Sequence, residues 1–179
     1  MSRTIVAIRR RGLSPSQEST EEVVAVAEDD VDFAVAAYRE DGEWQLVELH
    51  HSVAEDFDDL TEALGRFPSD VGVLGMVSMN DDFFVLVRKV GTQVRALLSD
   101  VTAADESALA SGVADRIDGP DADGDDPQPA GDLDIISDLG MAALELGVLC
   151  DDDDLYPDEI LGDVARRLGF GDAFERIVG

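Results

Sequence analysis

The sequence predicts an α+β protein: a five-stranded antiparallel sheet with helices on one face, in the order ββαβββα, followed by a small all-helical C-terminal module. Two observations lead to this prediction. Between residues 31 and 117, short apolar runs alternate with turn signals, and amphipathic helical patterns follow the second and fifth runs. Residues 118–132 are rich in Asp, Pro and Gly and contain no large apolar side chain, which indicates a linker before residues 133–179.

Residues 31–49 predict a β-hairpin. Phe33, Val35 and Ala37 lie at alternate positions, as on one face of a strand. Asp41-Gly42 is a dipeptide that adopts the positive φ angles of a type I′ turn, which is the turn that best joins two twisted antiparallel strands. The apolar residues between positions 44 and 49 then form the returning strand.

A helix is predicted from Ser52 to the residue before Pro68. Ser52 is followed three residues later by Glu55, the pattern of a capping box, and Pro68 ends the helical pattern. The apolar side chains between these limits recur at spacings of three and four and therefore share one face: Val53, Phe57, Leu60, Leu64 and Phe67.

Three more strands and a second helix complete the predicted sheet domain. The strands cover residues 71–77, 83–87 and 94–98, and the turns between them are Asn80-Asp81-Asp82 and Gly91-Thr92. A long helix is predicted over residues 102–117, opening with a capping box between Thr102 and Asp105. Its predicted inner face consists of Ala108, Leu109, Val113 and Ile117.

The C-terminal module, residues 133–179, is predicted to contain three or four short helices. Apolar sets end at Gly140 and before the acidic residues 151–154, and a further helix opens at Pro157 and closes at Gly169. Four of its apolar side chains are expected to face a core or a partner: Leu144, Val148, Leu161 and Leu168. At the other end of the chain, residues 1–30 have weak periodicity and are interpreted as a poorly ordered leader.

Charge is the outstanding feature of the composition. The 179 residues include 41 Asp and Glu but only 13 Lys and Arg, giving a formal net charge of -28. Such a chain repels phosphate backbones and anionic lipid surfaces, so direct binding to nucleic acid or to a membrane is disfavoured, and basic proteins or cations are the expected partners. Acidity that serves only solubility or adaptation to salt is the alternative. Cys150 is the single cysteine, which fits a reducing cytoplasm, and no apolar run is long enough to span a membrane.

Two acidic clusters suggest metal binding, but neither fits a known site. Asp121, Asp123 and Asp125 resemble the start of an EF-hand loop with Asp132 at its twelfth position. The turn glycine of that loop is replaced by Asp126, so a flexible acidic linker is the better interpretation. The four aspartates at 151–154 are interpreted as a solvated turn whose charge favours the N-terminus of the following helix.

The remaining polar candidates do not form a catalytic pattern. His50 and His51 are adjacent at a strand end, where neighbouring side chains diverge, so a shared metal is not expected. One of them as a general base is left open, without an identified Ser or Cys partner. Arg166 and Arg167 are expected to be surface charges or to balance nearby aspartates. The sequence therefore assigns no catalytic, cofactor-binding or metal-binding residue.

Two parts of the chain together resemble the tRNA adenosine deaminase-associated protein family. The residues that carry this resemblance are DFAVAAYREDGEWQL at 32–46, LLSDVTAADESALA at 97–110, GDLDIISDLG at 131–140 and LYPDEILGDVARRLGF at 155–170. The resemblance implies a partnership with the tRNA-editing deaminase, and it supplies no catalytic residues to carry over.

The chain is not expected to be that deaminase. Zinc deaminases use H-x-E and P-C-x-x-C to hold the metal, whereas His51 is followed by Ser52 and Val53, and Cys150 stands alone. The leading hypothesis is a non-catalytic accessory protein that binds the deaminase, or another basic protein, through its acidic surface. The alternatives are a small-ligand-binding domain with a site between sheet and helices near His50 or His51, and an acidic mimic of nucleic acid.

Overall fold

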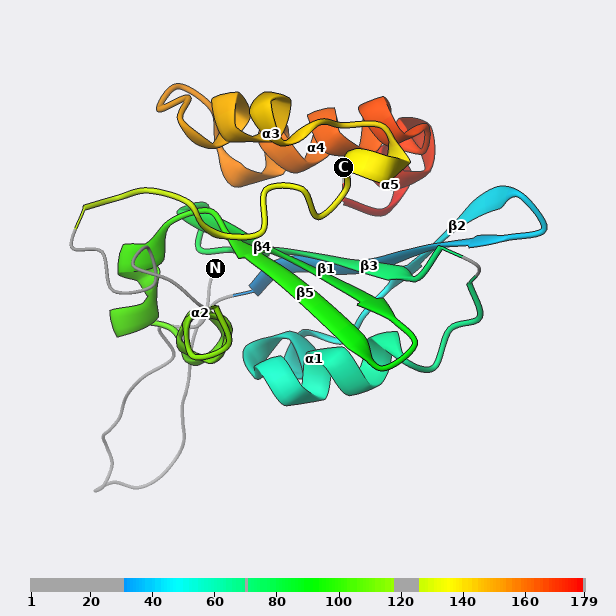
Figure 1. The fold of residues 1–179 in the computed structure, drawn as a ribbon, viewed down its shortest axis with the longest axis horizontal. Coiled ribbons are helices and arrows are strands. Elements are labelled where there is room, and N and C mark those ends of the chain that lie inside the picture. The colour runs from blue at the N-terminus through cyan, green and yellow to red at the C-terminus, as the bar shows by residue number, and fades with distance from the viewer. Residues whose placement is uncertain (1–30, 70, 118–125, 179) are drawn as a thin grey trace, which may run out of the picture. The chain divides into compact units, whose positions relative to one another are not determined.

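The computed structural model describes residues 31–69, 71–117 and 126–178. The chain from Val31 to Gly179 forms one compact unit, in which the sheet and the C-terminal helices pack together (Figure 1). The predicted leader, residues 1–30, lies outside the described residues, as do residues 118–125 of the predicted linker.

The sheet is antiparallel, as predicted, but it has six strands and not five. The order across the sheet is β2-β1-β3-β4-β5-β6. The strands are β1 (Val31–Glu40), β2 (Glu43–Glu48), β3 (Val73–Met79), β4 (Phe83–Val90), β5 (Gln93–Leu98) and β6 (Ala130–Gly131). The sixth strand comes from the stretch that was predicted to be linker, where Ala130 and Gly131 pair with Leu98 and Leu97. The outer edge of β5 presents backbone groups that can pair with a further strand, and β6 takes this position.

The predicted turns are confirmed in the backbone. Asp41 and Gly42 have φ angles of 55° and 84°, the positive values that a type I′ turn requires. Asn80 and Asp81, between β3 and β4, have φ angles of 57° and 52°. The Asp32 carboxylate supports this second turn, since its Oδ2 accepts hydrogen bonds from the backbone N–H of Asp81 at 2.7 Å and from Ser78 Oγ at 3.0 Å.

Both helices of the predicted ββαβββα unit lie on one face of the sheet, and the C-terminal helices cover the other (Figure 1). The first face carries α1 (Phe57–Leu64) and α2 (Ala108–Ala114). The second carries α3 (Ala143–Cys150), α4 (Pro157–Leu168) and α5 (Gly171–Val178). Because both faces are covered, β3 is buried along its whole length and β4 over its first six residues.

The first helix begins later than the capping-box pattern predicted. Residues His51–Glu55 form a 3-10 turn, and α1 starts at Phe57 with Asp56 as its N-cap. The Asp56 carboxylate accepts hydrogen bonds from the N–H groups of Asp58 and Asp59 at 2.8 and 3.1 Å. Asp caps a helix about as well as Ser, and the helix has Asp56 as its cap where the sequence predicted Ser52.

The second predicted helix is divided in two. A 3-10 turn at Val101–Asp105 is followed by α2, which starts only at Ala108 with Ser107 as its cap. The predicted Thr102 cap is replaced by Asp100, which accepts a hydrogen bond from Thr102 N at 2.9 Å. The predicted inner face is confirmed at Leu109 and Val113, which are buried. It is wrong at Ala108, which is exposed, and Ile117 lies beyond the end of the helix.

A glycine lets α1 approach the sheet closely. Gly75 lies in the middle of β3, and a Cβ atom placed there would come within 3.0 Å of the Leu64 side chain at the end of α1. Leu64 is fully buried in the core between α1, α2 and the sheet. A side chain at position 75 would therefore require the Leu64 side chain to shift by a few tenths of an ångström.

Aromatic residues join the C-terminal helices to the edge of the sheet formed by β2 and β1. Trp44 of β2 donates from Nε1 to the carbonyl of Leu168 at 3.1 Å, and its ring lies 4.8 Å from that of Phe170. Phe33 of β1 meets Phe174 of α5 in an edge-to-face arrangement with ring centroids 5.5 Å apart. Such pairs stabilise beyond their buried area and fix the relative orientation of the two layers.

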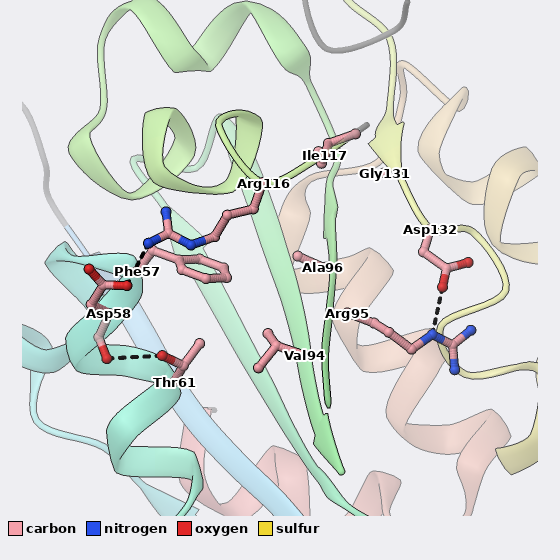
Figure 2. Close-up of a pocket in the computed structure, with 10 residues that line it drawn as sticks. All are labelled: Phe57, Asp58, Thr61, Val94, Arg95, Ala96, Arg116, Ile117, Gly131 and Asp132. Carbon is pink, nitrogen blue, oxygen red and sulfur yellow. Dashed lines mark hydrogen bonds and ion pairs between the residues drawn. The ribbon is translucent and has the colours of Figure 1, made fainter. Parts of the chain in front are cut away.

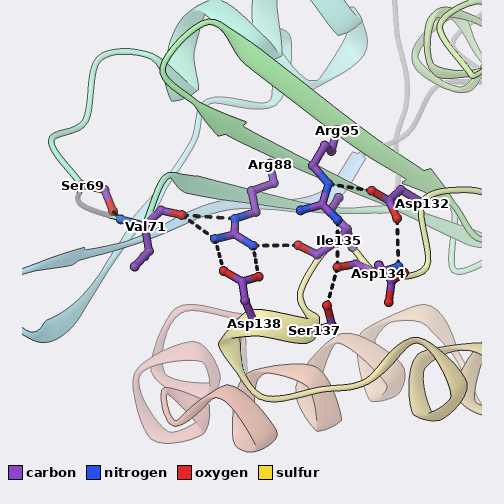
Figure 3. Close-up of polar contacts among 9 residues, drawn as sticks. All are labelled: Ser69, Val71, Arg88, Arg95, Asp132, Asp134, Ile135, Ser137 and Asp138. Atoms are coloured by element: carbon purple, nitrogen blue, oxygen red, sulfur yellow. Dashed lines mark hydrogen bonds and ion pairs between the residues drawn. The ribbon is translucent and has the colours of Figure 1, made fainter.

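A buried arginine fixes the beginning of the C-terminal module to the sheet (Figure 3). Arg88 of β4 is only 4% exposed and faces the module. Its guanidinium makes a bidentate ion pair with Asp138, at 2.5 and 2.9 Å, and also donates to the carbonyl oxygens of Val71 and Ile135, at 2.6 and 2.9 Å. This pairing holds the pKa of the Asp138 carboxyl below its usual value.

Arg95, the cross-strand neighbour of Arg88 on β5, holds the beginning of the same segment. Its Nε donates to Asp132 Oδ2 at 2.6 Å, and its Nη2 donates to the carbonyl of Asp134 at 2.9 Å (Figure 3). The two arginines thus bind residues 132–138 at two points, directly after β6 and before the helices of the module.

Replacing Arg88 by Met should lower the free energy of unfolding by about 2 kcal/mol, because it leaves the carbonyl groups of Val71 and Ile135 without their donor, while the Asp138 side chain, which is 58% exposed, becomes hydrated. Chemical denaturation monitored by circular dichroism measures this change. The control is Arg66→Met, which removes only an exposed pair with Glu62 at 3.8 Å and should change stability by no more than about 0.5 kcal/mol. Equal effects of the two substitutions would contradict the anchoring role of Arg88.

Replacing Asp138 by Asn should destabilise the protein in a pH-dependent way. Because the folded-state pKa of Asp138 is lowered, its contribution is present above the unfolded-state value of about 4 and is lost as the pH falls through the folded-state pKa. Urea denaturation at several pH values should therefore show a gap between wild type and variant at neutral pH that closes in acid. Asp153→Asn, in the exposed acidic turn, is the control, and a gap for Asp138→Asn that stays constant with pH would contradict the assignment.

Candidate functional site

The two histidines lie on the surface, and one of them caps a local turn. Both are exposed, at the junction between β2 and the 3-10 turn that precedes α1. His50 Nδ1 lies 2.8 Å from Ser52 Oγ and accepts a hydrogen bond from Ser52 N at 3.2 Å, so the ring caps the turn. Among the residues that the structure describes, no group of three or more His, Cys, Asp or Glu side chains is placed to hold a metal ion.

The aspartates singled out in the sequence take different roles. Asp121, Asp123 and Asp125 lie outside the described residues. Asp132, which stood at the twelfth position of the EF-hand-like pattern, is bound to Arg95. Residues 151–154 form an exposed turn, as predicted, in which Asp152 Oδ1 accepts a hydrogen bond from Asp154 N at 3.0 Å.

A cavity of about 540 Å³ lies between α1, the edge of β5 and β6 (Figure 2). Apolar side chains line its centre, and an ion pair lies on either side: Arg116 with Asp58, and Arg95 with Asp132, both at 2.6 Å. Arg116 also lies over the ring of Phe57, 4.5 Å from its centroid. The charged groups of this cavity therefore already bind one another. Neither His50 nor His51 lines it, in contrast to the ligand site considered from the sequence.

The outer surface of α3 is the most exposed apolar feature of the described residues. Leu144 is 80% exposed and Val148 is 62% exposed, so neither faces the core of this chain, and of the two alternatives predicted for them, a core or a partner, the second stays a prediction. The other two residues of that prediction, Leu161 and Leu168 of α4, are buried against the sheet as expected. Leu144 and Val148 are four residues apart on a helix, so they lie side by side on one face.

These two side chains line a groove between α3 and α4 with a volume of about 620 Å³. Met141 and Leu149 extend its apolar lining, and Arg166 and Arg167 of α4 form the opposite wall. Arg166 is paired with Asp163 and with Glu175, and Arg167 is paired with Glu145 at 2.8 Å. Both arginines are therefore surface charges, as one of the two predictions had it, and among their partners only Asp163 is an aspartate.

The single thiol lies on the inner side of α3 and is protected. Cys150 packs against the core between the C-terminal helices and the sheet. Burial raises the pKa of its thiol to about 12, and the neighbouring Asp151 charge adds to the effect. This environment is the opposite of the electropositive, accessible setting of a reactive cysteine.

Sequence reasoning did not find the groove, although one signal was present. In a chain with 30% charged residues, the eight residues of α3, ALELGVLC, contain a single charge. A helix that is apolar on all sides is normally buried on all sides. The buried side of α3 was predictable from this composition, but the absence of a covering element on the other side depends on the tertiary structure.

Comparison with known proteins identifies a matching family and a relative. The sequence model of the family described as "Rv3753c-like tRNA adenosine deaminase-associated protein" matches residues 32–171. Protein Rv3753c of Mycobacterium tuberculosis (strain ATCC 25618 / H37Rv) is 36% identical to this chain over 150 residues, which cover 82% of this chain and 87% of the relative. No solved structure matches. In the described residues, no helix has both the length and the apolar character needed to cross a membrane.

Cys150 should react with a thiol reagent at least about 100-fold more slowly in the folded protein than after unfolding. A rise in pKa from 9.0 to about 12 lowers the thiolate fraction near pH 8 by a factor of about 1,000. The rate of reaction with Ellman's reagent, with and without denaturant, measures the effect, and glutathione serves as the free-thiol control. A folded-state rate equal to that of glutathione would show that α3 does not pack as described.

Proposed function

This chain belongs to the Rv3753c-like tRNA adenosine deaminase-associated protein family, and on this premise we propose that it is a non-catalytic accessory protein that binds a tRNA adenosine deaminase. The family description names an association and no reaction. The observation that carries the proposal is the family match over residues 32–171, which spans the sheet and most of the C-terminal helices.

The charge of the chain supports a protein partner with a basic surface. A net charge of -28 repels tRNA but attracts a protein face that carries positive charge to bind tRNA. Complementary charges of this kind mainly accelerate association and select the partner, and they are screened by salt. The proposed complex should therefore form quickly at low ionic strength and weaken as salt is added.

The arrangement of the polar residues supports a non-catalytic role. His50 caps a local turn, the Cys150 thiol is partly buried, and the arginines of the α1–β5 cavity and of the α3–α4 groove are bound to carboxylates. The zinc-binding motifs of deaminases are missing from the sequence. The chemistry in the proposed complex belongs to the deaminase.

Acidity also favours a second candidate function, in which the protein imitates nucleic acid and occupies the tRNA-binding surface of the deaminase. The two functions differ in one measurable respect. An accessory protein that binds elsewhere leaves tRNA binding intact, whereas a mimic competes with tRNA.

The purified protein should bind the tRNA adenosine deaminase of the same organism, with an affinity that falls at least about tenfold between 50 and 500 mM salt. Isothermal titration calorimetry measures this directly, and an acidic protein of similar size and charge but unrelated fold is the control. The absence of binding at low salt would refute the proposed function. Binding that does not respond to salt would refute its electrostatic part.

Deaminase assays on tRNA with and without this protein then distinguish the two candidate functions. If it is an accessory protein, the Michaelis constant for tRNA should stay the same or fall. If it is a mimic, that constant should rise in proportion to the concentration of this protein.

A further inference from the structure

We infer that the groove between α3 and α4 is the docking site for an amphipathic helix of the partner protein, whose apolar side chains cover Leu144 and Val148 and whose basic side chains meet the aspartates at 151–154. This inference rests on the proposed function and specifies the contact surface. The first support for it is the composition of α3. Its inner side is buried through Leu146, but its outer side presents Leu144 and Val148 to solvent at 80% and 62% exposure.

The geometry of the groove suits a helix. Leu144 and Val148 are one turn apart, which matches the spacing of the apolar stripe on an amphipathic helix. The wall formed by Arg166 and Arg167 gives the groove a second side, and its apolar lining continues through Met141 and Leu149. An apolar groove of this form binds a helix through side chains at spacings of three and four residues.

The charge around the groove selects a basic helix. The charged residues that line the groove, Glu145, Asp163, Arg166 and Arg167, sum to a formal charge of zero, and Glu175, which pairs with Arg166 outside the lining, adds one negative charge. The exposed aspartates at 151–154 follow α3 directly and add four negative charges at its C-terminal end. A bound helix with Lys or Arg at the corresponding end satisfies this charge.

The same charge disfavours a second copy of this chain as the occupant. Two copies, each with a formal charge of -28, repel one another. The negative charge that repels a second copy attracts a basic partner.

The test replaces Leu144 and Val148 together by Gln, which keeps helix propensity and charge while removing the apolar contact. Because both side chains are exposed, the melting temperature should not change. Binding of the full-length variant to the deaminase should weaken at least about tenfold in calorimetry. The matched control is Val90→Gln with Val94→Gln, two valines at 40% and 38% exposure in the β4–β5 hairpin, which should bind like wild type.

A second variant tests the acidic part of the site. Asn at all four positions 151–154 keeps an acceptor for the Asp154 N–H at position 152 but removes the charge. This variant should associate more slowly with the deaminase and lose part of the salt dependence, as measured by stopped-flow fluorescence. Unchanged association kinetics would overturn the assignment of the basic end of the helix.

The outcomes separate this inference from the proposed function. If the deaminase binds wild type and the Leu144/Val148 variant equally, the groove is not the docking site, although the proposed function stands. If the deaminase binds neither, the proposed function fails, and a synthetic Leu/Lys amphipathic helix decides the inference. That peptide should bind wild type at least about tenfold more tightly than the variant, and a scrambled peptide of the same composition should not distinguish them.

Two further results would overturn the inference. One is equal binding of the Leu/Lys helix to wild type and variant. The other is a wild-type dimer in sedimentation velocity that the Gln substitutions dissociate, since this would identify a second copy as the occupant. A cross-linker attached at Leu144→Cys provides a direct check on the full chain, because the protected Cys150 leaves position 144 as the reactive thiol. It should capture the deaminase, whereas the same reagent at Val94→Cys should not.

Discussion

The guanidinium of Arg88 joins three segments that are distant in sequence: the loop before β3, the strand β4 and the start of the C-terminal module. A buried arginine that lacked any of its acceptors would be strongly unfavourable, so residues 71, 135 and 138 must come together if β4 is to be buried. The position of the C-terminal helices over the sheet follows from this requirement. Trp44 of β2 and Phe33 of β1 then bind the ends of this helical layer that lie over those two strands, through contacts with Leu168 and Phe174.

Covering the second face of the sheet also explains why one helix remains partly exposed. α4 and α5 lie against the sheet and bury their apolar faces there. α3 packs beside α4 and has only Leu146 fully buried. Two helices of the module, α4 and α5, thus pack against the sheet. The third, α3, has an apolar side toward solvent, next to the aspartates at 151–154. The surface proposed for a partner is therefore a consequence of how the core is completed.

The sequence was sufficient where structure is determined locally. Alternating apolar positions and the Asp41-Gly42 turn predicted the first hairpin, and Pro157 and Gly169 marked the limits of α4. Prediction failed where several local choices were equivalent, as at Ser52 and Asp56, which are equally good helix caps. It also failed where distant partners decide the structure. Nothing in an Ala-Gly pair indicates β6, and the burial of Arg88 depends on carbonyl groups contributed by Val71 and Ile135.

The candidate site, too, could be predicted from the sequence only in part. The apolar character of α3 was visible in its sequence, but its covered and uncovered sides were not, because they depend on where α4 lies. The short strand β6 has a further implication. By occupying the edge of β5 immediately before the residues held by Arg95 and Arg88, it couples the helical layer to the sheet through the backbone itself. Sheet and helices should therefore melt in a single cooperative transition, with one calorimetric peak, and neither should persist as a stable fragment after cleavage near residue 120.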